Sequence, residues 1–289
     1  MNIAGRSVEV ILAGQSPVGG YVACPDFEQY RYCWFRDGSF IADAMREAGH
    51  VESTDRFFDW CARVILSRPT GPWDARYSVD GAPDPSPWPK LQLDGLGLFL
   101  PAVRRRDSSR WDEATTTVAR WLEHHWGEPC VDWWEEREGV HAVTLWCVAE
   151  GLDSDDLRAE AIRLAADEQT DGSHLHIGTP VLVERVEESL LSGDTGVHRY
   201  LDDTYYGGGQ WLLLTAMLGL AKPERAEECL HWIEAHARAN GDLPEQSQDG
   251  LLHPERYEPW VEKWGEPASP LLWSHAMYLR LHHALRDRR

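Results

Sequence analysis

Residues 131–149, with the sequence VDWWEEREGVHAVTLWCVA, place two adjacent carboxylates directly after two adjacent tryptophans and just before an apolar run. A solvated acidic surface is normally diluted with Lys or Ser, whereas here Glu135 and Glu136 follow the indoles of Trp133 and Trp134. Apolar faces beside a carboxyl group favour its protonated form, so such an acid can donate a proton near neutral pH. Taken alone, the stretch favours the structural alternative, a buried tryptophan pair with acids near the positive end of a helix.

Helical segments recur along the whole chain, and loops rich in Trp, Asp, Glu and Gly separate every second pair of them. Ser109 with Asp112 has the spacing of a capping box and predicts a helix start at Ser109, and Ser154 predicts another cap. The segments 69–89 and 242–267 have no period and predict long irregular loops. Apolar residues at helical spacing predict further helices near 3–13, 40–48, 52–67, 141–151, 154–167, 181–191, 207–220, 223–240 and 270–285.

These segments together predict an all-α fold. About twelve helical segments are recognisable and almost no strand alternation is present. Helical hairpins whose functional loops gather at one end can close into a ring. No linker is long or polar enough to split the chain, so we expect one compact domain over residues 1–289.

The composition limits the kind of partner. The 289 residues contain 48 acidic and 28 basic residues, a formal net charge of −20, which disfavours nucleic acids and anionic membranes. A small neutral ligand is favoured instead. The chain has 15 tryptophans, whose indole faces can carry sugar rings but can equally form a core.

The cysteines and the N-terminal residues indicate a cytoplasmic protein. The six cysteines are scattered without a C-x-x-C pair, so reduced and buried thiols are expected. Residues 1–14 lack the pattern of a signal peptide, and no apolar run is long enough to span a membrane. Neither a metal nor another cofactor is expected, because the pairs His124-His125 and His174-x-His176 lack a third ligand and Gly207-Gly208-Gly209 follows no strand.

Five stretches in a fixed order carry a family resemblance. They are YRYCWFRD at 30–37, WPKLQLDG at 88–95, WWEE at 133–136, RYLDDTYYGG at 199–208, and LPEQ at 243–246 followed by WSHA at 273–276. In these motifs the chain resembles the catalytic domain of glycoside hydrolase family 15, the glucoamylase type. The resemblance implies an (α/α)6 barrel of six inner and six outer helices.

The resemblance also implies roles for individual residues. Glu135 would be the general acid on the glycosidic oxygen, and Glu245 the general base that activates water. Arg36, Asp37 and Arg199 would hold sugar hydroxyls. The remaining implied substrate-binding residues are the aromatic Tyr30, Trp34, Trp88, Trp134 and Trp273 and the polar Gln92, Asp94, Glu136 and Asp203.

The expected activity is inverting, exo-acting hydrolysis of short α-glucans with α-1,4 or α-1,6 linkages and release of β-glucose. If Glu245 activates water and does not attack the sugar, the anomeric configuration inverts. An α,α-trehalase is the nearest alternative, and a non-catalytic sugar-binding or regulatory domain is an alternative of another class. A binding domain needs neither Glu135 nor Glu245, so their presence favours an enzyme. Residues 137–198 are compressed relative to typical members of the family, which leaves the linkage and chain-length preference open. The sequence also leaves the oligomeric state open.

Overall fold

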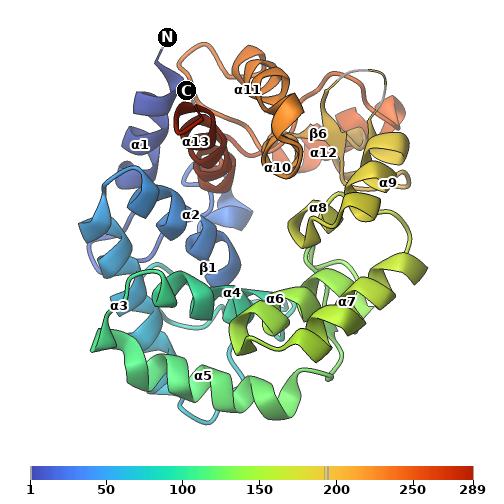
Figure 1. The fold of residues 1–289 in the computed structure, drawn as a ribbon. Helices are drawn as coiled ribbons and strands as arrows, with labels where there is room; N and C mark the ends of the chain where they lie inside the picture. The colour runs from blue at the N-terminus through green and yellow to red at the C-terminus, as the bar shows by residue number, and fades with distance from the viewer. Residues whose placement is uncertain (1, 192, 194, 289) are drawn as a thin grey trace. The chain divides into compact units, whose positions relative to one another are not determined.

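The computed structural model describes residues 2–191, 193 and 195–288, and helices dominate it (Figure 1). The residues group into two compact units, which are described separately. Unit 1 comprises Met1–Ile11, Cys24–Glu28 and Gln169–Arg289, and unit 2 comprises Leu12–Ala23 and Gln29–Glu168. The expectation of one domain over residues 1–289 stays a prediction.

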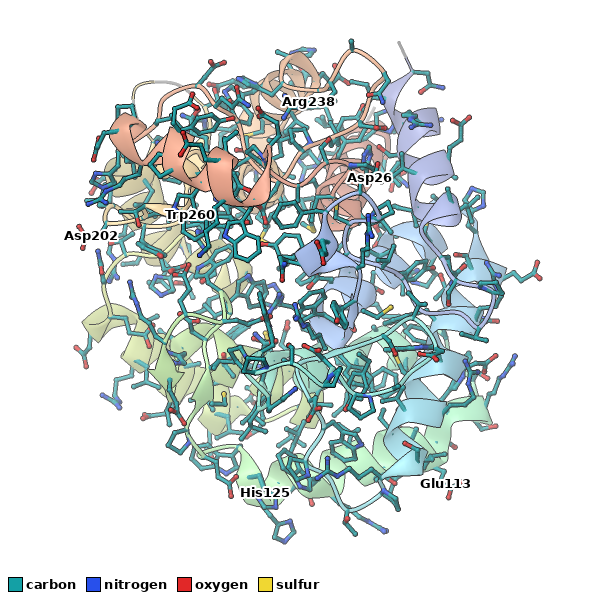
Figure 2. All side chains as sticks on the ribbon, turned by 180° about the vertical axis from the view of Figure 1, so that it is seen from behind. Asp26, Glu113, His125, Asp202, Arg238 and Trp260 are labelled. Atoms are coloured by element: carbon teal, nitrogen blue, oxygen red, sulfur yellow. The ribbon has the colours of Figure 1, made fainter. Side chains whose placement is uncertain are left out.

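Unit 2 alternates buried and amphipathic helices. Nearly every residue of α2 (Phe35–Glu47), α4 (Asp94–Arg104) and α6 (Ala142–Leu152) is buried. In contrast, α3 (Val51–Ser67), α5 (Asp112–His125) and α7 (Asp155–Asp167) expose a polar side. The helix α5 places Glu113 in its first turn, where an acid complements the positive end of the helix dipole, and His125 in its last turn (Figure 2).

Close approach of α4 and α6 depends on glycine. A Cβ atom on Gly97 would lie 2.5 Å from the backbone of Cys147, and one on Gly151 would lie 2.7 Å from the Gly97 carbonyl oxygen. Real Cβ atoms do not approach that closely, so these two glycines let the helices pack backbone to backbone. The contact fixes α4, whose first residue is Asp94, against the helix that follows Glu135.

Two short antiparallel ladders complete unit 2. Strand β1 (Cys33–Trp34) pairs with β2 (Arg76–Tyr77), and β3 (Cys130–Val131) pairs with β4 (Glu138–Gly139). The first ladder sets Trp34 opposite Arg76, and the second brings both ends of the turn that contains Glu135 together.

Unit 1 is built around two largely buried helices. These are α10 (Leu212–Ala221) and α13 (Leu272–Arg286), which pack on each other and on α11 (Ala226–Ala235). The ladder of β5 (Val197–His198) with β6 (Gln210–Trp211) leads into α10. The other helices are α1 (Ile3–Ala13), which begins in this unit, α8 (His174–Ile177), α9 (Pro180–Leu190) and α12 (Tyr257–Trp264).

The structure confirms the all-α prediction and corrects several boundaries. The helix expected near 40–48 starts at Phe35, and the helix expected over 223–240 ends at Ala235. The expected capping box is wrong: α5 starts at Asp112, and Ser108, not Ser109, caps the preceding 3-10 turn by accepting from the Arg110 N–H. The helix expected over 207–220 starts only at Leu212, after a 3-10 turn (Tyr205–Gly207) and β6. The segment 242–267 contains α12 and is not loop throughout. The cap at Ser154 is confirmed, since its Oγ accepts from the Leu157 N–H.

Two expectations about composition can be compared with the structure. Each of the six cysteines is buried and free. Within the described residues, no helix is both long and apolar enough to cross a membrane.

Candidate active site

The turn that carries Glu135 is built by Asp132. The Glu135 N–H donates to the Asp132 carbonyl oxygen at 3.0 Å, and the Asp132 N–H donates to the Arg137 carbonyl oxygen at 2.8 Å. The Asp132 carboxylate accepts from the Glu136 N–H at 2.8 Å. Gln92 supports the same turn, because its side-chain amide donates to the Asp132 carbonyl oxygen at 2.9 Å. The turn is therefore held by hydrogen bonds within it and by the Gln92 side chain from outside it.

Glu135 adopts a strained backbone conformation within this turn. Its φ is 64°, in the left-handed region that residues with a side chain rarely occupy. Such a conformation costs about 1–3 kcal/mol and persists only where surrounding contacts enforce it. The Asp132 bonds enforce it here, and the result is a carboxylate aimed inward from a turn whose neighbours Glu136 and Arg137 are exposed.

Both carboxylate oxygens of Glu135 are held. Arg36 donates from Nη1 to Oε1 at 3.1 Å, and the indole Nε1–H of Trp88 donates to Oε2. The Glu135 side chain is only 5% exposed. Arg36 lies in the first turn of α2, which Trp34 precedes in extended conformation, so the β1 ladder aims the guanidinium. A solvated surface acid would have neither contact.

Asp37 and Glu135 share the Arg36 guanidinium, and Asp94 interacts with it electrostatically. The Asp37 carboxylate lies 3.2 Å from Arg36 Nη2. Burial raises the pKa of Asp37 to about 6, with Arg36 opposing the rise and Glu135 adding to it. Burial also raises the pKa of Asp94 to about 8, again against Arg36 and with help from the Glu135 charge. Burial therefore favours the protonated form of Asp94.

Aromatic rings form one side of this cluster. Trp88 meets Trp34 edge to face with ring centroids 6.4 Å apart, and Tyr30 meets Trp34 in the same way at 6.0 Å. Trp34 is buried, whereas Tyr30 and Trp88 are partly buried and pack against it. Partly exposed rings beside held carboxylates suit a ligand with apolar faces and many hydroxyl groups.

Unit 1 contains a second buried charge cluster. Arg199 binds Asp203 through two parallel hydrogen bonds of 2.7 Å, with side chains 4% and 0% exposed. The Arg199 guanidinium carbon also lies 5.0 Å from the centroid of the Trp211 ring and 5.2 Å from that of Tyr205. Asp203 accepts the Tyr205 N–H at 2.9 Å. These contacts fix the fork of Arg199 in one orientation.

Glu245 lies in the same unit on a segment held along both edges. Its N–H donates to the Ala268 carbonyl oxygen at 2.8 Å, and its carbonyl oxygen accepts the Leu212 N–H at 3.4 Å. Glu245 is 2% exposed. At the start of this segment, the Leu243 N–H donates to Nε2 of the buried His275 at 3.0 Å. The carboxylate therefore does not belong to a solvated loop.

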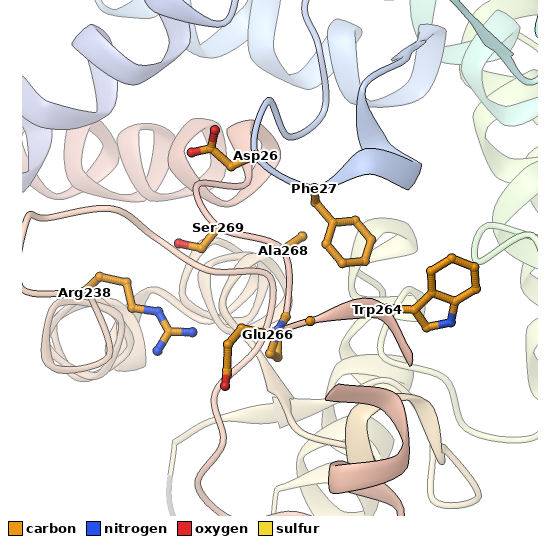
Figure 3. A pocket seen from close by; sticks show the side chains of 9 residues that line it. Asp26, Phe27, Arg238, Trp264, Glu266, Ala268 and Ser269 are labelled. Atoms are coloured by element: carbon orange, nitrogen blue, oxygen red, sulfur yellow. The ribbon is translucent and has the colours of Figure 1, made fainter. Parts of the chain in front are cut away.

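A surface pocket of about 320 Å³ borders this segment (Figure 3). Its side chains include Phe27, Trp264, Arg238 and Glu266, none of them a predicted site residue. Its wall includes Ala268, whose carbonyl oxygen holds the Glu245 N–H.

Comparison with known proteins identifies the family. Residues 3–173 match the family model for glycosyl hydrolases family 15. An isomaltose glucohydrolase from Kribbella flavida is 34% identical, in an alignment that covers 96% of this chain and 91% of that protein. The chain belongs to glycosyl hydrolases family 15.

Solved structures agree with this family assignment. A glycosidase that is 32% identical to this chain superimposes on it with a TM-score of 0.85, over 98% of this chain and 96% of that one. A variant described as a glycosidase in complex with glucose gives 0.84. A bacterial glucoamylase complexed with acarbose, 18% identical, gives 0.78 over 99% of this chain and 56% of that one, and shows the fold alone. The predicted family, the (α/α)6 barrel fold and a glycoside hydrolase activity are confirmed.

In this family 15 enzyme, the predicted site residues fall into two groups. Unit 2 brings Arg36, Asp37, Trp88 and Asp94 to Glu135. Gln92 lies behind the turn and bonds Asp132. Trp134 and Glu136 flank Glu135 in sequence, and Tyr30 and Trp34 form the aromatic side. In unit 1, Arg199 and Asp203 form one cluster, and Glu245 lies on the segment held by Ala268 and Leu212. Trp273 lies in the first turn of α13, next to Ser274, which donates to the Pro244 carbonyl oxygen.

Motif reasoning missed three residues that hold the site together. These are Asp132, His275 and Arg76, which pairs with Trp34 across the β1 ladder. Asp132 directly precedes the WWEE motif and His275 lies within WSHA, so their positions in the sequence could have indicated a role. Arg76 lies in an aperiodic loop and belongs to no motif. Among the described residues, no group of three or more His, Cys, Asp or Glu could hold a metal ion.

Proposed function

We propose that this family 15 enzyme is an inverting, exo-acting α-glucoside hydrolase that releases β-glucose from the non-reducing ends of short α-glucans. The observation that carries the proposal is the Glu135 carboxyl group, 5% exposed, bound through both oxygens and presented by a residue with φ of 64°. A group fixed in this way is oriented toward one reacting atom.

The proposed chemistry assigns different tasks to two carboxyl groups. Glu135 gives its proton to the glycosidic oxygen, so the leaving sugar departs as an alcohol. Glu245 takes a proton from water, which attacks the anomeric carbon and inverts its configuration. The backbone bonds of Glu245 to Ala268 and Leu212 support this role, because a base must keep its position while the proton moves.

The remaining site residues suit a neutral sugar. Arg36, Asp37 and Arg199 offer donors and acceptors for hydroxyl groups, and Tyr30, Trp88, Trp134 and Trp273 offer ring faces. Among α-linkages we propose α-1,6 first, because the Kribbella flavida relative at 34% identity is an isomaltose glucohydrolase. The net charge of −20 favours a neutral oligosaccharide, and six free thiols suit a reducing, cytoplasmic setting.

A substrate panel tests the proposal. Initial rates of glucose release are measured on isomaltose, maltose, maltotriose and trehalose with the wild type and with Glu135→Gln. Isomaltose should be turned over fastest, and the substitution should abolish most of the rate on every substrate. Preferred turnover of trehalose would assign the alternative activity, and an inactive wild type that still binds sugars would support a binding domain.

A further inference from the structure

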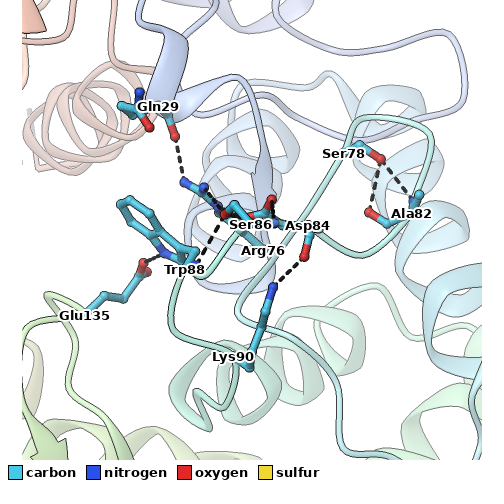
Figure 4. Close-up of polar contacts among 9 residues, drawn as sticks. All are labelled: Gln29, Arg76, Ser78, Ala82, Asp84, Ser86, Trp88, Lys90 and Glu135. Atoms are coloured by element: carbon cyan, nitrogen blue, oxygen red, sulfur yellow. Dashed lines mark hydrogen bonds and ion pairs between the residues drawn. The ribbon is translucent and has the colours of Figure 1, made fainter.

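The loop between α3 and α4 is folded around one buried ion pair. Arg76 and Asp84 are 3% and 1% exposed at their side chains, and Arg76 Nε donates to Asp84 Oδ2 at 2.7 Å. Arg76 Nη1 donates to the Gln29 carbonyl oxygen at 2.8 Å. Ser86 donates from Oγ to Asp84 Oδ2 at 2.6 Å and from its N–H to Oδ1 at 3.0 Å (Figure 4). These polar contacts tie the two ends of the loop segment 76–86 together.

The same guanidinium supports the indole of Trp88. The Arg76 guanidinium carbon lies 3.7 Å from the centroid of the Trp88 ring and 4.2 Å from that of Tyr32. The backbone N–H of Trp88 donates to Ser86 Oγ at 3.3 Å, so the ion-pair network holds both the ring and the main chain of Trp88. On another edge, Trp34 meets the Trp88 ring edge to face. These contacts leave the indole one orientation.

That orientation aims the indole N–H at the candidate acid. Trp88 Nε1 donates to Glu135 Oε2, as Figure 4 shows. We propose that Arg76 and Asp84 are positioning residues that place the Glu135 carboxyl group for proton transfer through Trp88. The inference rests on the proposed role of Glu135 as general acid, and neither Arg76 nor Asp84 contacts Glu135 directly in the described structure.

Two physical effects favour positioning over a purely structural role. A cation held against the ring face fixes the plane of the indole, and with it the direction of the N–H toward the Glu135 carboxyl group. In addition, small misplacements of a catalytic group cost rate steeply, because proton transfer needs hydrogen-bond geometry. Removing the pair should therefore affect the step that needs an acid more than steps that need only sugar binding.

A choice of leaving group isolates that step. Cleavage of isomaltose breaks a carbon–oxygen bond and requires a proton on the departing oxygen. In α-glucosyl fluoride the carbon–fluorine bond breaks and fluoride departs as an anion, so the acid is not needed. Both substrates still need the base and the same glucose-binding residues.

The variants are Arg76→Gln/Asp84→Asn, which removes both charges together, and Arg76→Lys, which keeps the charge but loses the planar fork. Trp88→Phe removes the indole N–H alone. A matched control is Arg110→Gln/Asp59→Asn, because Arg110 pairs with Asp59 and lies 5.5 Å from the Trp111 ring centroid, and the Trp111 N–H also donates to Asp59. Thermal melts verify that each variant is folded.

For Arg76→Gln/Asp84→Asn we expect kcat on isomaltose to fall at least about tenfold, part of the 10²–10⁴-fold that general acid catalysis contributes. The rate on α-glucosyl fluoride should fall much less. Trp88→Phe should show the same pattern, and adding it to the double variant should lower kcat little further, because the residues act in one chain. Arg76→Lys should be intermediate, and the Arg110 control should match wild type.

A readout independent of activity is the indole N–H spectrum of protein labelled with ¹⁵N-tryptophan, in which Trp88→Phe identifies the Trp88 signal. That signal should shift in the Arg76 variants and stay in place in the Arg110 control. Equal losses on both substrates, or an unchanged Trp88 signal with unchanged kcat, would overturn the positioning role. Full turnover of isomaltose by Glu135→Gln would instead overturn the proposed function, so the two failures are distinguishable. If the double variant does not fold, Arg76→Lys and Trp88→Phe carry the same tests.

Discussion

Protonation of His275 should destabilise the segment that carries Glu245. The His275 ring is fully buried, accepts the Leu243 N–H at Nε2 and lies 2.8 Å from Ser7 Oγ at Nδ1. Burial lowers its pKa from 6.5 to about 3, with Asp242 opposing and the Arg6 charge adding to the effect. A protonated ring would lose its acceptor at Nε2, so the Leu243 N–H would be left without a partner.

The magnitude follows from linkage between protonation and folding. A histidine whose pKa is lower in the folded state binds its proton more readily when unfolded, so stability is lost as pH falls. The contribution is fully present above about pH 6.5 and shrinks by about 1.4 kcal/mol per pH unit down to about pH 3. At pH 5 the loss attributable to His275 is therefore about 2 kcal/mol.

Urea unfolding of wild type and His275→Gln at pH 8 and pH 5 measures this loss. The His275→Gln variant should be less stable than wild type at pH 8, because a buried ring is replaced. Since glutamine does not titrate, the variant should lose about 2 kcal/mol less stability than wild type on going from pH 8 to pH 5. The exposed His124→Gln serves as control and should follow wild type. Parallel pH dependence in wild type and His275→Gln would refute the reasoning.

Three further predictions concern carboxyl groups. Glu135→Gln and Glu245→Gln should each lower kcat on isomaltose at least about a hundredfold in steady-state kinetics, whereas Glu138→Gln, at an exposed position, should not. Near wild-type turnover by either of the first two variants would contradict the assignment of that residue as general acid or base. Asp94→Asn should gain stability over wild type as pH rises from about 4 to 8, because ionisation of the buried carboxyl opposes folding; a difference in unfolding free energy that does not vary with pH would contradict this. Asp203→Asn should cost about 3–5 kcal/mol because it removes the carboxylate that binds the buried Arg199 guanidinium through two hydrogen bonds, and a loss below about 1 kcal/mol in urea unfolding would contradict it.

Sequence pattern predicted the helices whose apolar residues follow a helical period. The helices α3, α6 and α13 agree closely with the predicted ranges. The helix α12, with the sequence YEPWVEKW, was missed because it has no fully buried residue. It is held by the ring of Trp260, which packs against Tyr205 and Tyr206 from a distant segment.

Sequence motifs could propose the residues of the candidate site but not the contacts between them. Motifs located Arg36 and Glu135, yet their ion pair joins positions 99 apart in sequence. Arg76 left no signal, because strands of two residues are too short to show alternation and its partners lie in two separate segments, residues 29–34 and 84–88. Tertiary packing decides such contacts, and local pattern does not record them.

The anomeric configuration of the first glucose released tests the central claim most directly. Isomaltose is mixed with the enzyme in the NMR tube, and the anomeric protons of glucose are followed before mutarotation equilibrates the two forms. Hydrolysis in which Glu135 protonates the leaving oxygen and Glu245 activates water predicts that the β-anomer accumulates first. Initial accumulation of α-glucose would contradict the account.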